Sequence, residues 1–255
     1  GYDMREHSIP LFQALTDGLT EMGADVIDIG LSSTPMSYFA NGSLKADASI
    51  IITASHNTGE WNGFKLCRAD AVPISGATGI KDIEKAVVDD VYKSVSDVSG
   101  TVTKHDILPE YIKHIQSYAD IRKPIKIAAD LANSMGIVEE KVLEGILSVD
   151  TIFAEMDGTF PNHEANPLKL ETLQDIQNKV ATGRYDFGVA FDGDADRVGF
   201  VDEKGAVVPM DIITALIAKS LLQHEKGPIL YDLRSSWAVK ETIEEAGGTA
   251  LLSRV

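Results

Sequence analysis

Apolar residues along the chain follow two different spacings, one typical of helices and one typical of buried strands. Leu11, Leu15 and Leu19 are four residues apart within residues 10–22, which places them on one face of a predicted helix. Residues 46–54 (ADASIIITA) are instead a continuous run rich in β-branched side chains, and such a run is typical of a strand buried on both faces. Both kinds of segment recur along the whole chain.

The recurring patterns predict an alternation of helices and strands. Helices are expected at 10–22, 35–39, 79–94, 107–119, 134–147, 170–180, 209–223 and 236–246. Strands are expected at 26–30, 46–54, 63–67, 125–129, 150–154, 186–191, 198–202, 228–232 and 249–252. The alternation predicts an α/β fold made of consecutive related domains with mainly parallel (mixed) sheets. The polar, Ser/Thr-rich residues 95–106 are interpreted as a domain junction.

Composition narrows the class of protein. The 255 residues are 44% hydrophobic and 24% charged, as in globular proteins, and carry a formal net charge of −16 without a basic run, so we expect no nucleic-acid partner. No apolar run approaches the ~20 residues of a membrane helix, so we expect no membrane partner. The single Cys67 excludes an internal disulfide and suits a cytoplasmic protein. Five dispersed histidines, His163 among them, are expected at the surface or as caps.

The first candidate for chemistry is the segment DGDADR, residues 192–197. Asp192, Asp194 and Asp196 follow a predicted apolar strand at alternate positions, and alternate side chains of an extended segment point the same way. Three convergent carboxylates repel one another unless a cation neutralises them. Oxygen ligands favour a hard metal, Mg²⁺ first, and Arg197 adds a fixed positive charge suited to a phosphate oxygen.

Two other interpretations of this segment are weighed. An acidic surface turn is the plain alternative, but three alternating Asp residues at a strand end, followed by Arg197, argue against it. A calcium EF-hand is the second, since Glu203 stands at the twelfth loop position. However, position six, where an EF-hand needs Gly, is Arg197, and the flanks are predicted strands.

The second candidate is TASHNTGEWNGFK, residues 53–65. Ser55 follows the predicted strand, and ligand sites in open α/β sheets gather at the carboxyl ends of strands. His56 is adjacent, and Lys65 brings a cation into the next strand. Ser55 is therefore a candidate nucleophile or phosphate carrier, and a Ser/Asn/Gly loop with an incidental histidine is the alternative.

Taken together, the two segments favour phosphoryl transfer. A serine that carries a phosphate needs a cation to neutralise it, and three carboxylates can hold that cation. The chain has no GxxxxGK[ST] motif, so ATP is not an obvious donor.

At these residues the chain resembles the α-D-phosphohexomutases, the phosphomannomutase/phosphoglucomutase superfamily. The resemblance lies in TASHN with NGFK and in DGDADR, and also in GYDMR at the start, the STP turn and NHEANPLKLETL. It implies a domain I at 1–98 that lacks its first strand, a domain II at 99–206 that ends in the metal loop, and the start of a domain III at 207–255. It further implies that the chain is an N-terminal fragment, impaired or inactive as a catalyst.

The resemblance also implies roles for individual residues. Ser55 is expected to be the phosphoserine, which holds Mg²⁺ together with the three Asp residues of DGDADR. Arg197 is expected to contact the phosphoserine, and His56 and Lys65 to flank it as acid/base or charge-stabilising groups. Arg5 and Arg234 are expected to bind substrate.

The implied reaction interconverts hexose 1-phosphate and hexose 6-phosphate, of mannose or glucose. Glucose or mannose 1,6-bisphosphate would be its activator and intermediate. One departure is Thr58, where the family loop usually has Pro. Two alternatives stay open: a mutase-like domain that binds Mg²⁺ or phosphate without turnover, and an unrelated metal-dependent phosphohydrolase.

Overall fold

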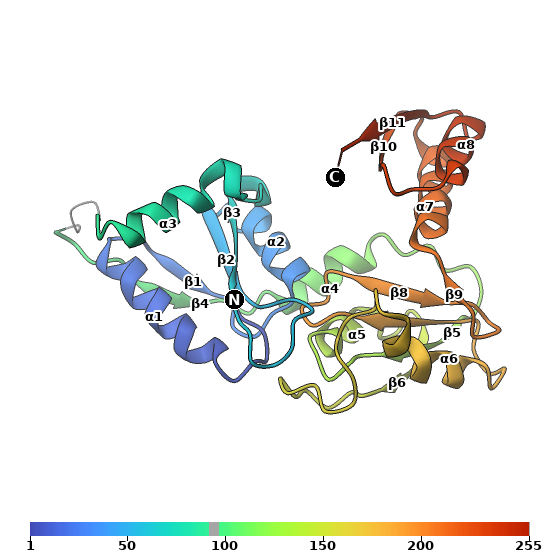
Figure 1. The fold of residues 1–255 in the computed structure, drawn as a ribbon, viewed down its shortest axis with the longest axis horizontal. Helices are drawn as coiled ribbons and strands as arrows, with labels where there is room; N and C mark the ends of the chain where they lie inside the picture. The colour runs from blue at the N-terminus through green and yellow to red at the C-terminus, as the bar shows by residue number, and fades with distance from the viewer. Residues whose placement is uncertain (92–96, 255) are drawn as a thin grey trace.

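A computed structural model describes residues 1–91 and 97–254, which form three successive α/β units (Figure 1). The α-helices are α1 (Ser8–Glu21), α2 (Thr34–Ser43), α3 (Lys81–Val88), α4 (Leu108–Gln116), α5 (Gly136–Leu143), α6 (Gln174–Val180), α7 (Met210–His224) and α8 (Trp237–Glu245). The strands are β1 (Val26–Asp28), β2 (Ala48–Ile52), β3 (Phe64–Arg68), β4 (Val102–Lys104), β5 (Lys126–Asp130), β6 (Ser148–Ile152), β7 (Phe187–Phe191), β8 (Val198–Val201), β9 (Val207–Val208), β10 (Pro228–Asp232) and β11 (Thr249–Ser253). Short helical turns are η1 (Ala69–Ala71), η2 (Gly76–Ile80) and η3 (Leu170–Leu173).

The first unit contains two strand pairs joined by the N-terminal residues. β1 pairs with β4 in parallel, and β2 pairs with β3 antiparallel. Tyr2 forms parallel bridges to Leu31, just after β1, and to Ile52 of β2. The N-terminal segment therefore lies between the two strand pairs. It contacts the last residue of β2, and Ser55 follows three residues later in the chain.

The helices of the first unit begin and end where local chemistry favours it. After α1, Gly23 adopts a φ of +86°, a left-handed conformation that glycine reaches without steric cost and that ends helices. At the start of α2, the side chain of Ser33 accepts a hydrogen bond from the backbone N–H of Met36. Pro35 occupies the first turn, where its missing N–H costs nothing.

The second unit is a five-stranded sheet in the order β6-β5-β7-β8-β9. β5, β6 and β7 are parallel, whereas β8 and β9 are antiparallel to their neighbours. β5 and β7 lie inside the sheet, and their apolar side chains form its core with those of α5 and α6. The acidic segment 192–197 leaves the carboxyl end of β7, the edge where ligand sites of α/β sheets gather.

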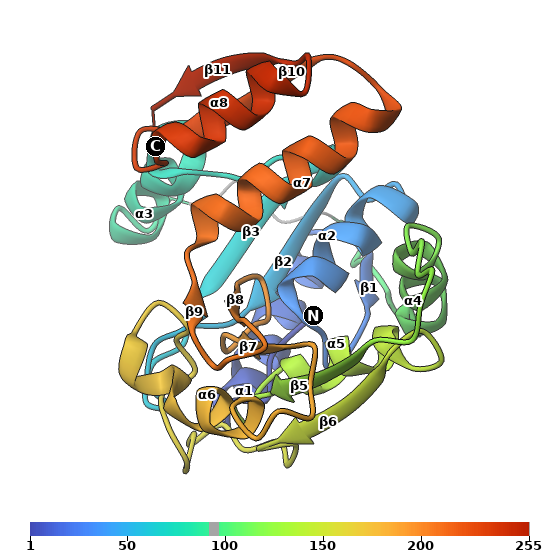
Figure 2. The same cartoon turned by 90° about the vertical axis from the view of Figure 1, so that its right-hand side faces the viewer.

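The third unit follows β9 and lies at the upper right in Figure 1. β10 and β11 pair in parallel, and α7 and α8 pack together over a small apolar core (Figure 2). Nowhere in residues 1–91 and 97–254 is a helix both long and apolar enough to cross a membrane.

The observed α/β fold with mixed sheets confirms the predicted class, but some segments differ. β4 lies within residues 95–106, which were interpreted as a junction, and its pairing with β1 extends the first unit to Lys104. β9 likewise belongs to the sheet of the second unit. Both strands are too short for a periodic signal. Residues 92–96, which include the end of the helix predicted at 79–94, lie outside the described residues.

The burial of β2 also differs from the prediction. Ile51 and Ile52 are fully buried, whereas Ala48 is exposed and Ser49 and Ile50 are half-buried. Only the carboxyl end of β2 is enclosed, because Tyr2 bridges to it there and β3 lies on its other side. An unbroken apolar run therefore overstated the burial of the strand.

His163 is not the surface or capping residue that its isolated position in the sequence suggested. Its Nε2 lies 3.0 Å from Oδ2 of Asp130, a fully buried carboxylate at the end of β5. The hydrogen bond with Asp130 raises the pKa of His163, and burial opposes the rise only in part. The pair connects the loop before η3 to the end of β5, an internal strand of the second unit.

We predict that this pair makes stability depend on pH. The pKa of His163 is higher in the folded protein than in the unfolded chain, where it is about 6.5. The pair therefore stabilises the fold fully below about pH 6.5, and this stabilisation is lost as the pH rises through the pKa of His163 in the folded protein. The free energy of unfolding, measured with urea between about pH 5.5 and about pH 9, should fall more steeply with pH in the wild type than in His163→Gln. An unchanged slope in His163→Gln would contradict the prediction, and His224→Gln, at an exposed position, is the control.

Candidate active site

The loop after β2, residues 53–63, holds Ser55 in a specific backbone conformation and is called the serine loop below. Ser55 has a φ of +52°, a left-handed conformation that costs about 1 kcal/mol or more in a residue other than glycine. The side chain of Thr53 supports it by accepting the backbone N–H of Ser55 at 2.9 Å. Non-glycine residues in such conformations concentrate at functional sites, which agrees with the predicted role of Ser55.

Arg5 is buried beneath the serine loop, and the structure contradicts its predicted role in binding substrate. Its two terminal nitrogens donate to four carbonyl oxygens of the loop, at distances of 2.7 to 3.1 Å. The acceptors are the carbonyls of Ser55, Asn57, Thr58 and Trp61. Nε donates to Asp3 at 3.0 Å. All five N–H donors of the guanidinium are thus used, and Arg5 organises the loop instead of lining a pocket.

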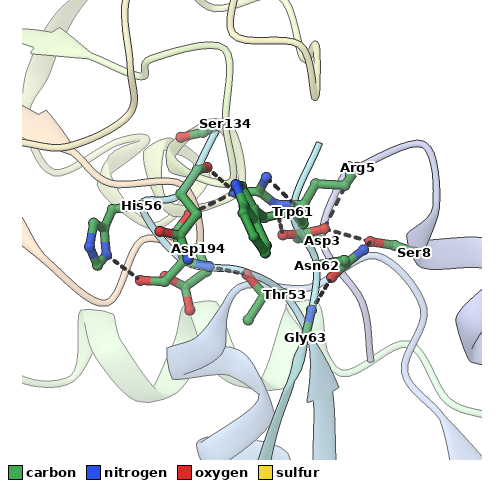
Figure 3. A network of polar contacts seen from close by, with 12 residues as sticks. Asp3, Arg5, Ser8, Thr53, His56, Trp61, Asn62, Gly63, Ser134 and Asp194 are labelled. Atoms are coloured by element: carbon green, nitrogen blue, oxygen red, sulfur yellow. Dashed lines mark hydrogen bonds and ion pairs between the residues drawn. The ribbon is translucent and has the colours of Figure 1, made fainter. Parts of the chain in front are cut away.

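Neighbouring residues enclose this arginine on several sides. Asp3 accepts hydrogen bonds from Arg5 and from the hydroxyl of Ser8, which in turn accepts from Asn62. The ring of Phe160, from the second unit, lies 5.0 Å from the guanidinium carbon. In Figure 3, Arg5 and Ser8 lie at the right of the serine loop, whereas His56 and Asp194 lie at its left. The loop is therefore supported from the side opposite to the acidic residues.

The acidic loop, residues 192–197, presents its three carboxylates together. One oxygen of each Asp side chain lies within 4.8 Å of the others. Asp192 and Asp194 are fully buried, whereas Asp196 is exposed. The hydroxyl of Ser134, after β5, donates to the carbonyl of Asp192 at 3.0 Å. The loop is therefore held by the neighbouring strand of its own sheet.

The serine loop and the acidic loop meet directly. Ser55 Oγ donates to Asp192 Oδ2 at 3.1 Å, although the residues are 137 positions apart in the sequence. Gly193 makes this approach possible, because a Cβ at that position would lie 2.2 Å from the carbonyl oxygen of Ser55. The first and second units thus contribute one loop each to a common site.

We predict that Gly193→Ala separates the two loops. The added Cβ would overlap backbone and not a flexible side chain, so the free energy of unfolding should fall by about 1–3 kcal/mol in urea titrations. The affinity for Mg²⁺, measured by calorimetry, should fall as well. Gly42→Ala is the control, because a Cβ there meets no atom of the described residues within 4 Å; in a helix it should stabilise by roughly 0.5–1 kcal/mol. Equal effects at both positions would contradict the prediction.

Lys65 connects two of the carboxylates. Its Nζ lies 2.5 Å from Asp194 Oδ2 and 2.6 Å from Asp196 Oδ2. Burial alone would lower the pKa of Lys65, but the charges of these carboxylates and their hydrogen bonds outweigh it and raise the pKa. Lys65 therefore stays protonated, which fits a charge-stabilising group and not a base.

The residues present fit a divalent cation. Oδ1 of Asp194 is buried and has no hydrogen-bond partner among the described residues, and an unpaired buried carboxylate oxygen is costly unless a cation compensates it. Burial and the charges of Asp194 and Asp196 raise the pKa of Asp192 to about 7. The raised pKa reflects burial and repulsion among the three carboxylates, which a bound cation would relieve, and their oxygen ligands suit a hard metal.

His56 and Arg197 border the Ser55 hydroxyl. His56 Nδ1 lies 3.4 Å from Ser55 Oγ and 2.9 Å from Nη1 of Arg197. Burial and the charge of Arg197 lower the pKa of His56, so the imidazole is neutral at pH 7. The Arg197 guanidinium also lies 3.7 Å from Asp196 and 3.9 Å from Asp192. Arg197 therefore contacts both the serine loop, through His56, and the acidic loop.

Most predicted site residues are brought together, and Arg234 is the exception. It lies in the third unit after β10, where it pairs with Asp232 at 3.0 Å with 76% of its side chain exposed. Its role in substrate binding stays a prediction. Sequence reasoning missed Asp3, Thr34 and Ser134. Pro35 indicated the start of a helix, but nothing local indicated that Thr34 faces Asp194.

Comparison with known proteins finds two matching family models and relatives that align with the whole chain. Residues 1–94 match the family described as phosphoglucomutase/phosphomannomutase, alpha/beta/alpha domain I, and residues 109–205 match domain II of the same family. The phosphomannomutase of Vibrio cholerae serotype O1 is 37% identical over 264 residues, with all of this chain and 57% of that protein aligned. The phosphoglucomutase of Neisseria meningitidis serogroup B is 33% identical over 257 residues, with 55% of that protein aligned.

The fold of the chain is also similar to that of a solved structure from the same family. A phosphoglucomutase/phosphomannomutase family protein from Burkholderia thailandensis superposes with a TM-score of 0.92 at 30% identity. The match covers all of this chain and 57% of that one. The chain thus spans a little more than half the length of the relatives that it matches.

Proposed function

The chain belongs to the phosphoglucomutase/phosphomannomutase family, and we propose that it forms the phosphoryl-transfer centre of a phosphohexomutase. Such an enzyme interconverts hexose 1-phosphate and hexose 6-phosphate through a phosphoserine. The observation that carries the proposal is the meeting of Ser55 with the acidic loop, Oγ to Asp192 Oδ2 at 3.1 Å, beside Lys65 and Arg197. A nucleophile, a cation site and fixed positive charges are what phosphoryl transfer requires.

In the proposed reaction Ser55 exchanges a phosphoryl group with the sugar. When Ser55 is phosphorylated by a hexose 1,6-bisphosphate, the bond from Oγ to phosphorus forms and the bond from a sugar oxygen to phosphorus breaks. The Ser55 hydroxyl donates to Asp192 Oδ2 at 3.1 Å, and the proton that leaves Ser55 ends on the departing sugar oxygen, which becomes a hydroxyl. His56 Nδ1 accepts from Arg197 Nη1 at 2.9 Å and so positions the guanidinium beside Ser55. Lys65 and Arg197 stabilise negative charge on the transferred group.

Asp192, Asp194, Asp196 and Ser55 are the residues that would hold Mg²⁺. When bound, the ion supplies positive charge to the phosphate oxygens. Lys65 meanwhile keeps Asp194 and Asp196 in place through its two short contacts.

The substrate proposed here is a phosphorylated hexose, with glucose and mannose both retained. Relatives named phosphomannomutase and relatives named phosphoglucomutase match the chain at similar identity, 37% and 33%. Glucose or mannose 1,6-bisphosphate is the proposed intermediate and activator. Arg234 is proposed as a sugar contact from the third unit.

The proposal is tested by following phosphate onto the protein. The chain is incubated with glucose 1,6-bisphosphate and Mg²⁺, and its intact mass is measured with and without EDTA. We expect one phosphoryl group on the peptide that contains Ser55, and none when EDTA is present. Binding of Mg²⁺ without any phosphorylation would favour a non-catalytic mutase-like domain, and steady release of inorganic phosphate would favour a phosphohydrolase.

A further inference from the structure

A chain of buried hydroxyl and carboxyl groups connects the second unit with the start of α2. Glu139 on α5 accepts a hydrogen bond at each carboxylate oxygen, from Tyr111 on α4 at 2.8 Å and from the hydroxyl of Ser33. Ser33 is fully buried, and its oxygen also caps α2 by accepting the N–H of Met36. The N-terminus of α2 is thereby tied to two helices outside its own unit.

The next residue of α2, Thr34, holds the acidic loop at two points. Its backbone N–H donates to the carbonyl of Asp194 at 3.0 Å, and its hydroxyl donates to Asp194 Oδ2. Lys65 contacts the same Oδ2. Both partners thus engage one oxygen of the carboxylate, and within residues 1–91 and 97–254 the other, Oδ1, has no hydrogen-bond partner. Thr34 and Lys65 together leave Oδ1 as the oxygen of Asp194 that faces no donor in this part of the chain.

Apolar packing on both sides makes this arrangement stiff. Met36 and Ala40 of α2 share one core cluster with Val138 and Val142 of α5. Ala195, between two of the Asp residues of the acidic loop, belongs to the same cluster. A closely packed interior of this kind resists small displacements, so the contact between Thr34 and Asp194 is held from both units.

We propose that Thr34 is a positioning residue for the cation site, and that Glu139 acts on the site through Ser33 and Thr34. The inference rests on the proposed function, because it concerns the cation that the acidic loop would hold. Groups that orient a ligand by hydrogen bonding typically change metal affinity by 10–100-fold when they are removed.

Two substitutions at position 34 separate positioning from packing. Thr34→Val keeps the shape of the side chain and removes the hydroxyl donor, whereas Thr34→Ser keeps the donor and removes a methyl group. The affinity for Mg²⁺ alone is measured by calorimetry, and folding is checked by thermal unfolding. We expect T34V to bind about 10-fold more weakly than the wild type and T34S to bind within about twofold of it. A residue that mattered only for packing would give the opposite order.

Glu139→Gln tests whether Glu139 acts through Thr34. The amide retains one acceptor oxygen, so one of the two hydroxyls loses its partner, and we expect weaker Mg²⁺ binding in the single variant. In the T34V background the same substitution should have no further effect, because two groups that act through one contact are not additive. Should T34V fail to fold, Glu139→Gln alone carries the test, with an unchanged affinity overturning the inference.

The outcomes distinguish the inference from the function on which it rests. A wild type that binds no Mg²⁺ overturns both. A wild type that binds Mg²⁺, with T34V unchanged in affinity or with additive effects of E139Q and T34V, overturns the inference alone. Weaker binding in T34V, recovery in T34S and non-additivity with E139Q support it.

Discussion

Ser55→Ala is expected to abolish the uptake of phosphate from glucose 1,6-bisphosphate. Alanine keeps the Cβ, so the strained φ of +52° is retained and the substitution removes only the hydroxyl with its hydrogen bond to Asp192. Removal of an enzyme's nucleophile costs several orders of magnitude in rate, so we expect a loss of at least about 1,000-fold. Intact-mass measurement over time gives the rate for both proteins.

The control for this prediction is Ser43→Ala, at an exposed serine on α2. It should be phosphorylated at the rate of the wild type. Phosphate that still appears in Ser55→Ala would show that another residue is the acceptor, and peptide mapping would locate it. Retained Mg²⁺ binding in Ser55→Ala would exclude loss of the acidic loop as the cause of an inactive variant.

Arg5→Met is expected to cause the largest loss of stability at this site. The guanidinium is fully buried, and its removal leaves the buried Asp3 carboxylate without its ion-pair partner. Four carbonyl oxygens of the serine loop lose their donors as well. Breaking a buried ion pair from one side typically costs 3–5 kcal/mol, and we expect a decrease of about that size in the free energy of unfolding measured with urea. Phosphorylation of Ser55 should fall with it.

Arg122→Met serves as the matched control for Arg5→Met. Arg122 also pairs with an aspartate two residues away, Asp120, at 2.6 Å, but both side chains are largely exposed. Exposed ion pairs contribute little, so the urea midpoint of Arg122→Met should stay close to that of the wild type. Similar midpoints for the two variants would contradict the structural role assigned to Arg5.

Local patterns predicted most of the fold because they depend on neighbours in sequence. The leucine spacing in α1 and the β-branched run in β2 each reflect preferences within a few residues, and both elements form where expected. The short strands β4 and β9 escaped prediction, since they are strands only by virtue of a partner: β4 pairs with β1, and β9 with β8. β4 pairs with a strand far back in the chain, and β9 has only two residues, so neither leaves a local signal.

In the candidate site, too, the sequence predicted some features and the structure alone revealed others. Ser55 and the three aspartates were predicted from residue types at strand ends, and the structure brings them together. Arg5 was predicted as a substrate contact because the resemblance to the phosphohexomutases implied that role. Its actual partners are backbone carbonyls, which every residue possesses and which therefore leave no mark in the sequence.

The sequence by itself determined the α/β class, the positions of the two loops and the chemistry that their side chains carry. Only the tertiary structure decided which atoms meet. Ser55 and Asp192 approach across 137 positions, and Thr34 reaches Asp194 across 160. The physical reason is that helices and strands form from short-range preferences, whereas such contacts depend on how two sheets and the helices between them pack. Among the residues that the structure describes, that packing leaves one oxygen of Asp194 without a hydrogen-bond partner, and it is there that we expect the cation to bind.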